Sequence, residues 1–186
     1  MALDRLHVES LASEYAEAEP LYTVEAEGVE TLPGAFSSGE YGWRDAAWVV
    51  RWYCRRSLRS GSDAPRRAIE DEFEDNGMDA VRDAIAGAVE ADDVDHAFDG
   101  LLTLAGVDVP VASAFLFYID PTTYVAVGER EWTALLEADE LGRPYPDSPS
   151  VDDYGRYLGA CRGLSEQYGY DLWSLYRALR RYPGAE

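Results

Sequence analysis

The chain has 186 residues, of which 36 are acidic and 16 basic, so its formal net charge is −20. Apolar residues make up 47%, which suffices for one packed domain and excludes disorder of the whole chain. Every basic residue is Arg. An acidic excess without Lys is typical of a halophilic protein, because concentrated salt screens repulsion beyond a few Å. No signal-peptide pattern and no membrane-spanning apolar run occurs, so we expect a cytoplasmic protein.

The N-terminal fifth of the chain divides into a regular and an irregular part. Helical spacing of apolar residues predicts a helix over residues 4–18, which ends before Pro20. Residues 21–24 predict one short strand. The glycines and prolines that follow predict a loop over residues 28–42, and a loop of about 15 residues inside a compact domain is often functional.

Residues 43–59 predict an amphipathic helix with two contrasting faces. The apolar face carries Ala46, Val49, Val50, Tyr53, Cys54 and Leu58. The opposite face carries Trp48, Arg51, Trp52, Arg55, Arg56 and Arg59. This face has three interpretations. The guanidinium groups stack on Trp and pair with carboxylates inside the fold, or they bind phosphates and stacked bases, or they form a protein–protein surface.

The middle of the chain predicts two short helices and then a helical hairpin. The short helices cover residues 65–76 and 78–90. A further helix runs over residues 92–105, with Asp92 or Asp93 as its N-cap. Gly106 favours a left-handed turn after it, and Pro110 fits the first turn of a second helix that reaches about Tyr118.

The C-terminal part predicts three more helices. After a turn at 120–123, residues 124–127 lead into a helix over 129–138. The loop 142–149 contains three prolines, and a capping box at Ser150 opens a helix that Gly169 ends. The last helix covers 171–181. The predicted fold class is all-α, with one domain over residues 1–186 and a helix-hairpin-helix unit at about 92–138.

The hairpin also carries a family pattern. Leu101, Leu104, Gly106, Val107 and Ala112 fit Leu-x-x-Leu-x-Gly-Val-Gly-x-x-(Thr/Val)-Ala, and the segment 127–130 fits Val-Asp-x-(His/Arg) except at its second residue. In these residues the chain resembles the helix-hairpin-helix DNA glycosylase superfamily. The resemblance covers residues 95–136. It implies a glycosylase-like helical bundle whose hairpin meets a DNA phosphate through Gly106, Val107, Asp108 and Val109.

The same resemblance implies that the catalytic groups are missing. The family's aspartate falls on Gly128, and its Schiff-base lysine falls on Asp99 or Pro110. Because the chain contains no Lys, Schiff-base chemistry by a lysine is excluded. The second hairpin glycine falls on Asp108, which brings a negative charge close to the expected phosphate. Glu129, next to the aspartate position, is the one replacement that we consider.

Cofactor and metal sites are not expected. The cluster-binding members of the superfamily use four C-terminal cysteines, whereas this chain has Cys161 alone in that region. Cys54 and Cys161 lie far apart and are interpreted as reduced core residues. His7 and His96, the two histidines, do not have the spacing of metal ligands.

Three hypotheses on function remain open. The first is a non-catalytic descendant of the glycosylase fold that binds nucleic acid or a protein weakly through the Arg/Trp helix and the hairpin. The second is an active base-excision enzyme that uses Glu129. The third is a structural or partner-binding protein without nucleic-acid contact. We favour the first, and the sequence identifies neither a ligand nor an oligomeric state.

Overall fold

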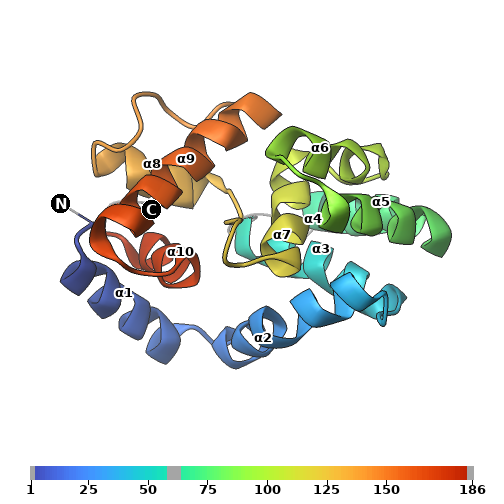
Figure 1. The fold of residues 1–186 in the computed structure, drawn as a ribbon, viewed down its shortest axis with the longest axis horizontal. Helices are drawn as coiled ribbons and strands as arrows, with labels where there is room; N and C mark the ends of the chain where they lie inside the picture. Colours follow the sequence, from blue (N-terminus) through green and yellow to red (C-terminus); the bar gives the residue numbers. More distant parts are fainter. Residues whose placement is uncertain (1–2, 58–63, 184–186) are drawn as a thin grey trace.

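The computed structural model describes residues 3–57 and 64–183, and within these ranges the chain forms ten α-helices, one 3₁₀ helix and no β-strand. The prediction of an all-α fold is confirmed. Figure 1 shows two groups of helices, one of which is made from both ends of the chain. The first group contains α1 (Arg5–Ala18), α8 (Glu129–Glu137), α9 (Val151–Tyr168) and α10 (Leu172–Arg181). The second contains α2 (Tyr22–Ser38), α3 (Trp43–Ser57), α4 (Ala64–Glu74), α5 (Met78–Glu90), α6 (Val94–Asp99), the 3₁₀ helix η1 (Leu101–Thr103) and α7 (Val109–Ile119).

Helix α7 is the centre of the second group. Every one of its residues is buried, which matches its apolar sequence around the whole circumference. It packs against α2, α3 and α5 in its own group and reaches α9 in the other. Because α7 has no solvent-facing side, other helices cover it all round, and α2 and α3 both pack on its surface.

The group formed by the chain ends is held by contacts between distant segments, and its helix α9 has the ends that the sequence predicts. Helix α1 lies along α10, and Tyr170 donates a hydrogen bond of 3.1 Å to the carbonyl of Leu3. Ser150 and Asp153 form the predicted capping box at the start of α9, and Gly169 ends this helix in a left-handed conformation.

The predicted strand at 21–24 and loop over 28–42 are wrong, because Tyr22–Ser38 is helix α2. Gly28 has a packing role rather than a turn role. A Cβ atom there would lie 3.1 Å from both Trp48 and Tyr118, so the missing side chain allows α2 to approach α3 and α7 closely. Pro33 lies inside the helix, and Gly39 ends it with φ +74°.

The hairpin region departs from the predicted helix 92–105. Helix α6 ends at Asp99, the chain continues as η1, and Gly106 then adopts φ +72° before α7 begins. Gly100, which follows α6, allows a close approach to α5, since a Cβ atom there would lie 3.1 Å from the Cα of Ala84. Asp93, one of the two residues predicted as the N-cap, is the N-cap of α6.

Residues 124–128 form a non-helical segment between the two groups of helices, and side chains pair several of its backbone polar groups. The hydroxyls of Tyr154, Tyr157 and Tyr53 donate to three successive carbonyls, those of residues 125, 126 and 127. Ser113 accepts the N–H of residue 127 at 3.0 Å. Buried backbone groups thereby keep hydrogen bonds without a neighbouring strand.

Among the described residues, no helix combines the length and the apolar character that crossing a bilayer requires.

Candidate functional site

A groove of about 240 Å³ lies between α2 and α3, and it is the place where the Arg/Trp face of α3 reaches solvent. The lining residues are Leu21, Val24, Trp48, Arg51, Trp52 and Arg55. Four of these six were predicted as binding residues from the sequence. Helices α2 and α3 both pack on α7, and the groove lies between their solvent-facing sides.

The two arginines of this groove are positioned to meet a ligand. Arg51 is half-buried and Arg55 is exposed. Within the ranges 3–57 and 64–183, neither guanidinium has a hydrogen-bond or ion-pair partner. In a chain with 36 acidic residues, two neighbouring arginines without such a partner form a cationic site in an otherwise acidic protein.

The indoles of the groove differ in how much surface they offer. Trp48 is half-buried and packs against Tyr118 in an edge-to-face arrangement, with ring centroids 5.1 Å apart. Trp52 is 2% exposed and stacks on Phe117 at 5.8 Å, so it forms the floor of the groove. Trp48 is therefore the indole that a planar ligand would contact over a substantial area.

Arg56 is buried and does not belong to the solvent-facing part of the Arg/Trp face. Its guanidinium is 6% exposed and forms ion pairs with the buried Glu25 and with Glu19, the latter at 2.5 Å. Burial opposes a charge on Arg56, but the neighbouring Tyr176 and Tyr15, together with the carboxylates of Glu25 and Glu19, outweigh it and raise the pKa of the guanidinium. Of the three interpretations of the Arg/Trp face, internal ion pairing thus applies to Arg56. Arg59 lies outside the described residues.

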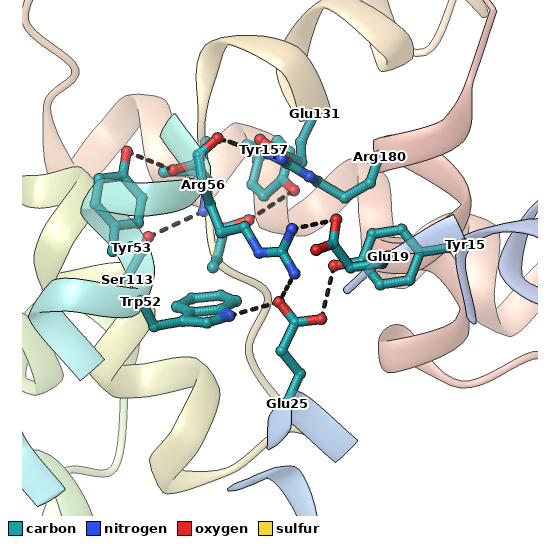
Figure 2. A network of polar contacts seen from close by, with 12 residues as sticks. Tyr15, Glu19, Glu25, Trp52, Tyr53, Arg56, Ser113, Glu131, Tyr157 and Arg180 are labelled. Carbon is teal, nitrogen blue, oxygen red and sulfur yellow. Dashed lines mark hydrogen bonds and ion pairs between the residues drawn. The ribbon is translucent and has the colours of Figure 1, made fainter. Parts of the chain in front are cut away.

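Glu25 is the centre of a buried polar network beneath the groove, which Figure 2 shows from close by. Its Oε1 accepts hydrogen bonds from Trp52 at 2.7 Å and from Arg56, while its Oε2 accepts the hydroxyl of Tyr15 at 2.7 Å. Burial, above all, raises the pKa of Tyr15, so the phenol stays protonated and donates. Glu25 thereby connects α1, α2 and α3.

A second buried ion pair extends this network into the group formed by the chain ends. Arg180 of α10, 7% exposed, pairs with Glu131 of α8 at 2.7 Å. The same guanidinium donates to the carbonyl of Arg56 at 3.2 Å, in the last turn of α3. Sequence reasoning missed Glu25, Glu131 and Arg180, because their partners are far away along the chain.

The hairpin residues that the sequence predicted as phosphate contacts are turned partly toward α4. A Cβ atom on Gly106 would lie 2.7 Å from the carbonyl oxygen of Ile69. Asn76 pairs with the backbone N–H and carbonyl of Ala105 at 2.9 and 3.0 Å, so this amide is occupied. Val107 and Val109 are buried.

Asp108 has a structural role at the start of α7. It is the N-cap of the helix, and its Oδ1 accepts the N–H of Val111 at 3.0 Å. The side chain is otherwise exposed. Helix capping therefore accounts for an aspartate at this position.

The position expected for a catalytic acid has no carboxylate of its own. Gly128 is the N-cap residue of α8, and Glu129 beside it is exposed in the first helical turn. Arg130 has its Nε and Nη1 atoms buried without a hydrogen-bond partner among the described residues.

Metal-binding geometry is absent from the part of the chain that the structure describes, where no three His, Cys, Asp or Glu side chains converge. Cys54 and Cys161 are both buried and reduced, in agreement with the interpretation as core residues. Comparison with known proteins found no matching family model, no matching curated protein and no matching solved structure.

Proposed function

We propose that this protein is a non-catalytic binding protein for single-stranded nucleic acid, built on a helical scaffold similar to that of the helix-hairpin-helix DNA glycosylases. The ligand lies in the α2/α3 groove. Arg51 and Arg55 bind a backbone phosphate, and the unstacked base that follows it packs against Trp48.

One observation carries this proposal: two arginines without a partner among the described residues share a groove with a half-buried indole. Guanidinium groups in ordinary internal use pair with carboxylates, as Arg56 does next to them. The groove is smaller than the roughly 300–1,000 Å³ of a typical small-molecule pocket, which suits one nucleotide unit. A base inside a duplex cannot reach Trp48, so a single strand is favoured.

The scaffold assignment is supported by three features of the central region. Gly106 adopts the left-handed conformation that the hairpin pattern requires. Pro110 occupies the first turn of α7. The non-helical segment 124–128 leads directly into the N-terminus of α8, at the place where the family pattern has its aspartate.

The absence of catalysis follows from the residues at that place. Gly128 supplies no carboxylate, and Glu129 lies on the exposed side of the first turn of α8. We expect no base release from damaged duplexes by the wild-type protein. Base release that disappears in Glu129→Gln would instead support the alternative of an active glycosylase.

Fluorescence anisotropy with labelled oligonucleotides in molar KCl tests the binding. We expect the wild type to bind a single strand more tightly than the matching duplex. Neutralisation of one phosphate by the two arginines predicts a slope of log Kobs against log[salt] of about −0.7, which falls toward zero in Arg51→Gln/Arg55→Gln. The control Arg44→Gln/Arg82→Gln removes the same charge from exposed positions outside the groove.

Two outcomes contradict the proposal. One is that no single strand binds at any salt concentration, which leaves the structural or partner-binding hypothesis. The other is that the control variant loses as much affinity as the groove variant, which means that net charge rather than the groove governs binding.

A further inference from the structure

A second hollow lies next to the groove and shares Trp48 with it. It measures about 130 Å³ and is lined by Val24, Glu27, Gly28, Thr31, Leu32, Asp45 and Trp48. Val24 and Trp48 line both hollows, so the two are neighbours along α2 and α3, and we call them together the channel. The channel is cationic at the end near Arg51 and acidic at the end near Glu27.

The acidic end offers hydrogen-bond acceptors that the fold leaves in large part unused. The carboxylate of Glu27 has no hydrogen-bond or ion-pair partner among the described residues. Asp45 uses Oδ2 to accept the N–H of Gly42 at 2.8 Å, and no described residue donates to its Oδ1. One hollow therefore offers guanidinium groups and the other offers carboxylates, and Trp48 borders both.

The helix geometry fixes the spacing of these groups. Asp45, Trp48 and Arg51 follow one another at intervals of three residues, so they lie on one side of α3. At 1.5 Å per residue, Asp45 and Arg51 are about 9 Å apart along the helix axis. Gly28 keeps the wall opposite Trp48 free of a side chain, because a Cβ atom there would lie 3.1 Å from the indole.

We propose that the channel selects nucleotides whose base carries an exocyclic amino group, as cytosine and adenine do. The phosphate lies at Arg51 and Arg55, the ring lies against Trp48, and the amino group donates to Glu27 and to Oδ1 of Asp45. Carboxylates accept hydrogen bonds from the N4 amino group of cytosine, whereas uracil and thymine present a carbonyl at that position. This selectivity rests on the proposed function, since it requires the base to occupy the groove.

Oligo(dC) and oligo(dU) of equal length test the selectivity, because their bases share ring size and differ chiefly in the amino or carbonyl group. We expect the wild type to bind oligo(dC) roughly fivefold more tightly than oligo(dU) at neutral pH, the effect of about one net hydrogen bond. In Glu27→Gln the ratio falls to one or below, because the amide also donates to a carbonyl. The control Glu30→Gln, an exposed position on α2 outside both hollows, keeps the wild-type ratio.

The outcomes separate this inference from the proposed function. If neither oligonucleotide binds, the proposed function fails and the selectivity fails with it. If both bind equally, or if Glu27→Gln preserves the preference for oligo(dC), the groove binds nucleic acid but the acidic hollow does not read the base. Because Glu27 is exposed, its substitution leaves folding intact, and a circular dichroism spectrum checks this.

Discussion

The indole N–H of Trp52 donates a hydrogen bond of 2.7 Å to Oε1 of Glu25, a carboxylate with no solvent exposure. This contact fixes the floor of the groove to helix α2 from below. A buried carboxylate is stable in such a place because its charge is paired and its oxygens are hydrogen-bonded. Trp52 therefore belongs to both the groove, which it lines, and the buried ion network, to which its N–H donates.

Substitution of Glu25 by Ala is expected to destabilise the fold strongly. It leaves the buried guanidinium of Arg56 without its main counter-charge, and loss of one member of a buried ion pair costs about 3–5 kcal/mol. Urea unfolding at constant salt measures the change. Exposed Glu30→Ala is the control, with no measurable change expected. A midpoint for Glu25→Ala equal to the wild type means that the network contributes little to stability.

Two glycines with the same backbone conformation are expected to respond differently to alanine. Gly39 and Gly106 have φ +74° and +72°, so both variants incur about 1–2 kcal/mol of left-handed strain. At Gly39 nothing lies within 4 Å of the added Cβ, whereas at Gly106 it meets the carbonyl of Ile69. Overpacking adds about 1–3 kcal/mol for Gly106→Ala. Equal losses in thermal or urea unfolding would show that α4 moves aside without cost.

Histidine titration by NMR tests the exposed pair of His96 and Asp93. The hydrogen bond that the His96 ring donates to the Asp93 carboxylate, together with the charge of Asp93, raises the pKa of His96 above the ordinary 6.5. Because the folded pKa is the higher one, the stabilisation is fully present below the unfolded pKa and is lost as pH rises through the folded pKa. Asp93→Asn retains an N-capping side chain but is expected to lower the pKa of His96. An unchanged titration curve contradicts the pairing.

The sequence predicted those elements whose signals are local. The capping box of Ser150, the left-handed Gly169 and the helix Met78–Glu90 all depend on residues within a few positions of one another. Helix α2 was not predicted, because glycine and proline usually interrupt helices and α2 contains both Gly28 and Pro33. The reason for Gly28 lies in Trp48 and Tyr118, which approach it only in the folded protein.

For the candidate site, the sequence predicted which side chains share a helix face but not which of them are buried in ion pairs. Periodicity correctly grouped Trp48, Arg51 and Arg55 on one side of α3. It could not separate them from Arg56, because the difference is made by Glu25, 31 residues earlier in the chain. Local patterns show which side chains share a helix face, whereas the partner of each charge depends on the packing of distant segments.

The five indole N–H groups of the protein provide the most direct test of the groove. In a ¹H–¹⁵N NMR titration with a short single-stranded oligonucleotide, the indole signal of Trp48 is expected to shift most and that of Trp52 to follow. Trp132 and Trp173, which line neither hollow of the channel, are expected to stay in place. Shifts confined to Trp132 or Trp173 would place the ligand elsewhere, and a spectrum without any shift at saturating oligonucleotide would contradict nucleic-acid binding by this protein.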